Sequence, residues 1–378
     1  MSLWSEFNAS SEDQWIKKVL DDSSNKTEQD FHWKTEYGNV NTFSKSISVL
    51  KSDKKDKLSE IIWNFKEEKN INSQILNRLK DGINSIHIDG INYTDSIFKN
   101  VMNDIINNHI ILSHNASKDD ISFWTDWINS NPNLKGSIRM CLLTKIIDGL
   151  NGDNNSIDFT DYRHHFQSNL NTNFKCIYVE IPSRHLSFNN HSSEIALTGA
   201  HLNEIIEIHK KNNIEIPKKI IIKSFLDNSF LENISKLKAI KSVINQVLKI
   251  HSIKSNLIIE TSVNPQILKD KSEDFRILSI TSTAMSSFIG GANSFVLSNS
   301  LLISKENYWR KIATNIPLIL HEESQINILK DVTKGAHVIE QISLKMADKA
   351  WRILKQIEVN GGLLKNLKNS SLREYIKN

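Results

Sequence analysis

Residues 219–262 read KIIIKSFLDNSFLENISKLKAIKSVINQVLKIHSIKSNLIIETS, which predicts a strand, a helix and a second strand. KIIIKSF (219–225) and LIIETS (257–262) are short runs rich in β-branched residues, whereas residues 229–250 carry apolar residues at helical spacing. A helix that connects two buried strands is typical of a βαβ unit, in which the strands run parallel. This stretch therefore predicts an α/β fold.

The same alternation continues along the chain in both directions. We expect further strands at 85–88, 110–113, 176–181 and 294–297, and further helices at 70–82, 94–105, 199–211 and 272–291. Roughly seven or eight such units fit a (β/α)8 TIM-type barrel, whose usual size is about 250 residues, better than an open sheet. The predicted domains are an N-terminal arm and linker at 1–57, the barrel at 58–362 and a C-terminal tail at 363–378.

The N-terminal segment has its own helical and extended character. Ser11 and Gln14 have the spacing of a capping box, and FHWKTEYGNVNTF (31–43) indicates a strand or an extended turn around Gly38. Trp4, Trp15 and Trp33 fall within this short piece. Aromatic anchors serve both cores and interfaces, so the arm either packs on its own barrel or grips another subunit.

Composition excludes several classes of protein. Lys and Arg total 47 against 43 Asp and Glu, a net charge of +4 that is spread along the chain and gives no footprint for nucleic acid. The sequence has neither the start of a signal peptide nor an apolar run of the length of a membrane helix, so we expect a cytoplasmic protein. Cys141 and Cys176 are too few for a disulfide framework and too far apart for a metal knuckle, which indicates ordinary buried thiols.

Histidines provide the other candidate constellation. His201, Glu204 and His209 could offer metal ligands along one helix, although a solvated amphipathic face is the favoured interpretation. His164 and His165 are interpreted in the same way, as loop or surface residues. The sequence contains no G-x-x-x-x-G-K, G-x-G-x-x-G or G-x-S-x-G motif, which leaves nucleotide-binding and hydrolase functions without support.

Short motifs in a fixed order carry a family resemblance. They are FHWKTEYG (31–38), GAHLNEI (199–205), SKLKAIK (235–241), SSFIGGANSF (286–295), WRKIATN (309–315) and residues 315–362 with E-E-S, D-x-x-x-G and A-W…I-E…G-G. Together they resemble the barrel of the methylmalonyl-CoA mutase family, in particular its small (beta) subunit. The resemblance implies acyl-CoA isomerisation with adenosylcobalamin, in which a barrel holds the substrate and a separate downstream domain holds the cofactor. The sequence given ends sixteen residues after Gly362, so the resemblance covers a barrel without the cobalamin-binding domain.

The residues that the family uses for chemistry are altered here. Ile195 and Ala196 stand where the resemblance implies a Tyr-His pair that holds the thioester carbonyl, and neither side chain can donate a hydrogen bond. Lys238 and Lys241 keep the positive charge of the K-x-R-A-x-R helix but lose the planar fork of arginine. The family's D-x-H-x-x-G cobalamin motif does not occur. We therefore expect no catalytic, cofactor-binding or metal-binding residue, and only Lys238 and Lys241 as candidate substrate contacts.

The resemblance implies a small, non-catalytic subunit that stabilises a catalytic large subunit, with adenosylcobalamin bound in that partner. The alternative is a working acyl-CoA mutase barrel that uses cobalamin from a separate cofactor-domain chain. A third possibility is a barrel that binds a small ligand unrelated to CoA. The barrel axis decides among these hypotheses, and Tyr178, Ile220, Ile222 and Ile258 are the residues expected to fill it.

Overall fold

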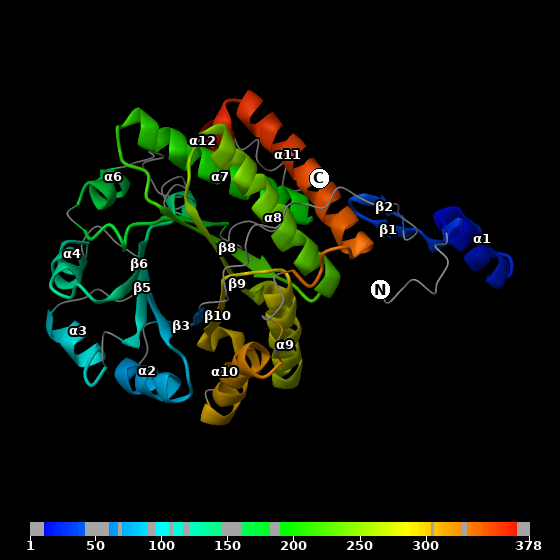
Figure 1. The fold of residues 1–378 in the computed structure, drawn as a ribbon. Helices are drawn as coiled ribbons and strands as arrows, with labels where there is room; N and C mark the ends of the chain where they lie inside the picture. Colours follow the sequence, from blue (N-terminus) through cyan, green and yellow to red (C-terminus); the bar gives the residue numbers. More distant parts are fainter. Residues whose placement is uncertain are drawn as a thin grey trace, which may run out of the picture.

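The chain folds into a barrel of eight parallel strands surrounded by helices (Figure 1). A computed structural model describes residues 11–41, 60–66, 70–89, 95–105, 109–115, 121–144, 160–168, 170–181, 190–303, 306–324, 326 and 331–368. The barrel strands are β3 (Glu60–Lys66), β4 (Ser85–Asp89), β5 (Ile111–Asn115), β6 (Lys135–Arg139), β7 (Ile177–Glu180), β8 (Lys219–Leu226), β9 (Asn256–Val263) and β10 (Ser294–Ser298). The predicted α/β class and TIM-type barrel are confirmed.

Closure of the barrel follows from the strand order β6-β5-β4-β3-β10-β9-β8-β7. The two end strands meet through parallel bridges between Ile138 and Lys175 and between Cys141 and Tyr178. Since the ring closes between β6 and β7, β9 lies three strands from β6 around the ring, and the two strands face each other obliquely across the interior. The sequence-based prediction names no strand at β3. The sequence from Gly136 onward, GSIRMCLLTK, is ambiguous because it also fits a strand that runs into a helix, and the other six strands are placed correctly.

Helices cover the outside of the barrel and pack on the sheet. They are α2 (Ile71–Lys80), α3 (Asp95–Val101), α4 (Ile121–Asn129), α6 (Thr160–Gln167), α7 (His191–Lys211), α8 (Phe230–Ile250), α9 (Glu273–Ile289), α10 (Asn307–Glu322), α11 (His337–Val359) and α12 (Gly362–Lys368). Helix α7 begins eight residues before the predicted start, because the side chain of Asn190 accepts a hydrogen bond from the backbone N–H of Ser193 at 2.9 Å. Gly290 caps the end of α9, and Gly361 follows the end of α11 with a φ of +100°.

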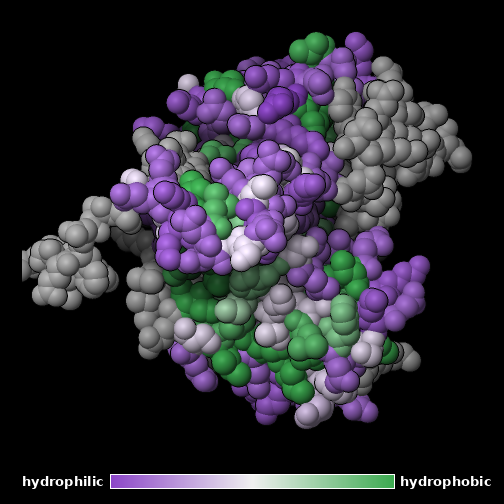
Figure 2. All heavy atoms as spheres, turned by 90° about the vertical axis from the view of Figure 1, so that its right-hand side faces the viewer, coloured by the Kyte–Doolittle hydropathy of each residue, from purple (hydrophilic) through white to green (hydrophobic). Residues whose placement is uncertain are grey.

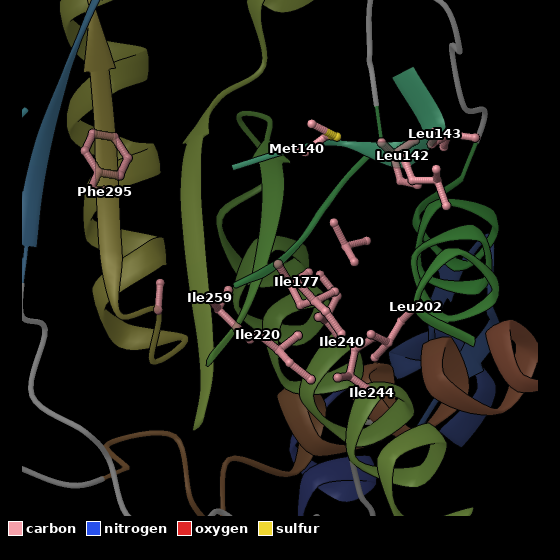
Figure 3. Close-up of a cluster of buried hydrophobic side chains, with 14 of the residues drawn as sticks. Met140, Leu142, Leu143, Ile177, Leu202, Ile220, Ile240, Ile244, Ile259 and Phe295 are labelled. Carbon is pink, nitrogen blue, oxygen red and sulfur yellow. The ribbon is translucent and has the colours of Figure 1, made fainter. Parts of the chain in front are cut away.

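Strand parity decides which side chains face the helices and which face the interior. Ile220 and Ile259 point outward and join the core beneath α8, where they lie near Ile240 and Ile244 (Figure 3). Ile222 belongs to the same outer core. The expectation that Ile220 and Ile222 fill the axis is therefore wrong. Alternation along a strand gives that position to Ile221, which packs with Cys176 and Tyr178 and against Ile258 in a separate inner cluster.

The N-terminal arm combines a helix and a hairpin. Helix α1 (Glu12–Asp22) begins with the predicted capping box between Ser11 and Gln14. Strands β1 (Trp33–Thr35) and β2 (Gly38–Val40) form an antiparallel hairpin. The hairpin docks on α11, because the side chain of Gln341 exchanges two hydrogen bonds with the backbone of Asn41 at 3.0 and 2.9 Å.

Beyond the hairpin, α1 projects away from the barrel (Figure 1). Trp15 and Trp33 are 49% and 37% exposed, whereas Val40 is fully buried. The hairpin thus packs on its own barrel, while the two tryptophans keep much of their surface free for solvent or another chain. Trp4 and the predicted linker, KSDKKDK at residues 51–57, lie outside the described residues. Among the described residues, no helix is both long and apolar enough to cross a membrane.

Candidate functional site

The interior of the barrel is lined largely by polar and charged side chains. Alternate residues of each strand point inward, and the buried ones include Ser85, His87, Ser113, Ser137, Arg139, Glu260 and Ser294. TIM barrels usually fill this space with layers of branched apolar residues. A polar interior needs internal partners for its charges, because a buried charge without one is costly.

An ion pair crosses the interior between β6 and β9. The guanidinium of Arg139 donates to both carboxylate oxygens of Glu260, with Nη1 to Oε2 at 2.8 Å and Nη2 to Oε1 at 2.6 Å. The side chains are only 5% and 2% exposed. Arg139 Nε also donates to Ser137 Oγ at 3.1 Å. This two-pronged pair holds the guanidinium across the barrel axis.

An aromatic side chain and a second acidic residue lie next to the Arg139–Glu260 pair. Its guanidinium carbon lies 5.3 Å from the ring centroid of Tyr178, and the Tyr178 hydroxyl donates to Glu180 Oε2 at 2.5 Å. Burial alone would lower the pKa of Arg139, but the Glu260 carboxylate and the other neighbouring acidic groups raise it above its ordinary value. Arg139 is therefore charged at every physiological pH. The predictions that Tyr178 and Ile258 face the interior are confirmed.

The two predicted substrate lysines lie on α8, outside the sheet. Lys238 Nζ binds Glu340 Oε1 at 2.7 Å, Thr333 Oγ1 at 2.9 Å and Asp331 Oδ2 at 3.3 Å. Lys241 Nζ donates to the carbonyl of Gly291 at 2.5 Å. These contacts give both lysines structural roles between α8, α9 and α11. A role in substrate binding stays a prediction.

Ile195 and Ala196 lie in the second turn of α7 and are both buried in the outer core. Their hydrocarbon side chains present no polar group. The absence of catalytic residues at these positions stays a prediction that the burial supports.

The expectation that His201 and His209 lie on a solvated face of their helix is wrong. His201 and His209 are fully buried, and burial lowers their pKa values to about 3 and about 4. His201 Nε2 accepts from the backbone N–H of Leu143 at 3.2 Å, and His209 Nε2 lies 3.2 Å from the hydroxyl of Tyr162. Glu204 lies instead at the junction of α7 with α12, where the backbone N–H of Leu364 donates to it at 3.4 Å. Helix α6 covers this face, so hydrophobic spacing on α7 alone could not reveal its burial.

The same correction applies to His165, which was expected at the surface. It lies on α6, is fully buried, and has a pKa lowered by burial to about 3. Neither ring nitrogen has a hydrogen-bond partner among the described residues. His164 on the same helix is exposed, as expected. Among the described residues no cluster of metal-ligating side chains occurs.

Both cysteines are free thiols that belong to the inner side of the barrel. Burial raises the pKa of Cys176 to about 11 and also raises that of Cys141. Raised pKa values keep the thiols protonated and unreactive. The prediction of ordinary thiols is confirmed for Cys176, which is buried, and Cys141 is partly buried.

The expectation that this chain binds no adenosylcobalamin stays a prediction. His165, His201 and His209 are fully buried, so none of these three rings is accessible to a large ligand. We therefore derive no step through that cofactor on this chain.

Sequence reasoning missed the pair that dominates the interior. Arg139 lies in a segment whose structure was ambiguous, and Glu260 stands within the strand run LIIETS. A charged residue at an alternate position of a buried strand was the available signal, because it indicates a partner across the interior.

Fold and interior together define a (β/α)8 barrel whose axis is crossed by a salt bridge. A family model described as methylmalonyl-CoA mutase matches residues 160–378, more than half of the chain. The chain belongs to the methylmalonyl-CoA mutase family.

Curated relatives match a shorter stretch. A methylmalonyl-CoA mutase of Cereibacter sphaeroides is 31% identical over 85 residues, which cover 22% of this chain and 12% of the relative. The methylmalonyl-CoA mutase small subunit of Propionibacterium freudenreichii subsp. shermanii is 29% identical over 83 residues, covering 21% of this chain and 13% of the relative. The matched stretch thus spans about an eighth of each relative's length. Among solved structures, the dihydropteroate synthase of Yersinia pestis aligns with a TM-score of 0.41 at 12% identity, covering 70% of this chain and 94% of that one.

Proposed function

We propose that this chain is a non-catalytic small subunit of a cytoplasmic, cobalamin-dependent methylmalonyl-CoA mutase. In this role it stabilises a catalytic large subunit that carries adenosylcobalamin and interconverts methylmalonyl-CoA and succinyl-CoA. The observation that carries the proposal is the Arg139–Glu260 pair, which spans the barrel interior from β6 to β9 with contacts of 2.8 and 2.6 Å.

A closed axis opposes catalysis by this barrel. An acyl-CoA that reached a reaction centre along the axis would have to separate Arg139 from Glu260, and each charge would then lack its buried partner. Breaking a buried pair costs about 3–5 kcal/mol, which binding of the substrate would have to offset. Lys238 does not compensate, because its ammonium is held by Asp331 and Glu340 on the outer side of the barrel.

The side of the molecule that carries the arm supports a subunit interface. Figure 2 faces the side from which α1 projects, and hydrophobic residues gather over part of this surface. Leu278 and Met285 of α9, the barrel helix on this side in Figure 1, are 68% and 38% exposed. With Trp15 and Trp33 on the arm, this surface offers the aromatic and aliphatic anchors that protein interfaces use.

The test is co-expression of the full chain with a mutase large subunit, followed by size-exclusion chromatography and turnover of methylmalonyl-CoA. We expect one complex, a higher thermal midpoint of the large subunit, and at least tenfold weaker association when Trp15→Ser and Trp33→Ser are combined. Val359→Ser is the matched control, because Val359 is 85% exposed at the far end of α11.

Two results would overturn the proposal. One is a large subunit that remains separate from this chain and is equally stable and active without it. The other is turnover by this barrel when it is supplied with adenosylcobalamin and a separate cofactor-domain chain, with loss of that turnover in Lys238→Met.

A further inference from the structure

A cavity of about 660 Å³ opens into the amino end of the barrel, below the salt bridge. Its size lies within the range of about 300–1,000 Å³ that is typical of small-molecule pockets. Glu60, Arg139 and Glu260 line its inner part, and residues that precede the strands, such as Lys135 and Lys218, also line it. TIM-barrel enzymes place catalytic groups at the opposite, carboxyl end. The location thus indicates a binding site rather than a reaction centre.

The cavity exists because one side of the interior has small side chains. Ser113, Ser137 and Gly136 line it from β5 and β6, while Ile221 and Ile258 fill the side of β8 and β9. Gly136 is required there, because a Cβ atom at this position would lie 1.7 Å from the carbonyl oxygen of Leu112. The open half of the interior is therefore set by the sequence of β5 and β6.

Glu60 supplies an acidic group on the cavity wall. Its Oε2 accepts from the Ser85 hydroxyl at 3.3 Å, and among the described residues no ion pair to Glu60 occurs. The neighbouring Glu260 has both oxygens bound by Arg139. Burial, and after it the charge of Glu260, raises the pKa of Glu60, and the charges of Arg139 and Lys219 offset this rise only in part. A cation beside Glu60 would relieve both the burial and the repulsion.

The cavity lysines divide into two kinds. Lys219 donates to the carbonyls of Gly136 and Asn173, both at 2.8 Å, so its ammonium is committed to joining neighbouring strands. Lys175 is held in the same manner by the carbonyls of Phe166 and Ser168. Lys135 and Lys218 are exposed and lie where the strands begin, so they place positive charge at the opening of the cavity.

We propose that this cavity binds a small zwitterionic molecule, with a primary ammonium group on Glu60 and a carboxylate or phosphate toward Lys135 and Lys218. The aliphatic middle of such a ligand would lie against Ile111, Ile221 and Ile258. The site is independent of the proposed subunit role, since every residue that forms it belongs to this chain.

Isothermal titration calorimetry of the full chain tests the proposal with three probes: 6-aminohexanoate, hexylamine and hexanoate. We expect 6-aminohexanoate to bind most tightly, hexylamine to bind more weakly, and hexanoate to show no binding at 10 mM. Glu60→Gln should weaken the two amine probes at least tenfold, because it removes the charge and keeps the shape. Glu207→Gln, which changes an exposed carboxylate on α7, should bind like the unaltered chain.

Several outcomes would overturn the site. They are no heat from any probe at 10 mM, equal affinity of the unaltered chain and Glu60→Gln, and preferential binding of hexanoate. Binding of pantetheine that is insensitive to Glu60→Gln would do the same, since it would assign the cavity to acyl-CoA chemistry. Should Glu60→Gln fail to fold, hexylamine binding to the unaltered chain must weaken as the pH falls and Glu60 takes up a proton. Hexylamine binding that does not change with pH would contradict the role of Glu60.

Discussion

We expect the two partners of the Arg139–Glu260 pair to differ in how much their removal destabilises the folded chain. In Arg139→Met, Glu260 loses its partner while Glu60 remains near it, so two carboxylates share the interior without their arginine. Removing one partner of a buried ion pair costs about 3–5 kcal/mol. Because the adjoining cavity admits water to one side, we expect the lower end of that range, about 3 kcal/mol.

Removing Glu260 should lower the free energy of unfolding less than removing Arg139. In Glu260→Leu, Arg139 can turn toward Glu60, whose charge already acts on it. The expected loss is about 1.5–3 kcal/mol, the range for hydrogen bonds to charged groups. The double variant Arg139→Met with Glu260→Leu should be more stable than Arg139→Met alone, since it leaves a single carboxylate in the interior.

Urea unfolding of the four proteins at pH 7.5, followed by circular dichroism, measures these differences. Repeating the series at pH 5 should shrink the loss in Arg139→Met, because Glu60, whose pKa burial raises, can then take up a proton. Additive effects of the two substitutions, or single variants within 1 kcal/mol of the unaltered chain, would refute the reasoning that the pair is a coupled plug.

Three further predictions concern His165, two glycines and Lys238. His165 is neutral in the folded chain and its pKa rises to about 6.5 on unfolding, so its contribution to stability is complete above pH 6.5 and is lost as the pH falls toward 3. In the free energy of unfolding, measured with urea from pH 7.5 to 5, His165→Leu should therefore reduce the slope against pH by up to one proton, and His164→Gln on the exposed face of the same helix is the control. Gly136→Ala should lower the free energy of unfolding by about 1–3 kcal/mol or more, because its Cβ would meet backbone. Gly199→Ala should cost less, because the new methyl meets the movable end of a leucine side chain, and equal urea midpoints would contradict this. Lys238→Met should destabilise the chain by about 3 kcal/mol in the same assay, because its carboxylate partners lose their buried cation, and an unchanged midpoint would count against that structural role.

The sequence predicts the barrel because each unit carries its own period. Strand 219–225 and helix 229–250 differ in the spacing of their apolar residues, and that difference survives without any knowledge of neighbours. Which side chains of a strand point into the barrel is less predictable, because a shift of one residue moves every side chain to the other face of the sheet. Ile220 and Ile221 are equally apolar, so nothing local shows which of them points inward.

Contacts between distant residues set the rest of the site. Arg139 meets Glu260 across 121 positions, and Lys238 meets Glu340 across 102. Charges of this kind look like ordinary surface residues until closure of the barrel brings their partners together. The buried histidines follow the same rule. The sequence predicts no helix at α6, so nothing indicates that a helix covers this face of α7.

The interior contains two features whose proposed roles can be tested separately, the Arg139–Glu260 ion pair and the cavity beside Glu60. Arg139, Glu260 and Tyr178 close the axis, and their closure supports a scaffold rather than a catalyst. Glu60, Ser113 and Ser137 line a chamber at the amino end of the barrel. Had the chain kept a passage for acyl-CoA, a charged pair across it would oppose that use. Had the interior become a plain packing core, branched apolar residues would replace the serines. The combination instead fits a barrel in which the axis is shut while one half of its interior remains available to a small ligand.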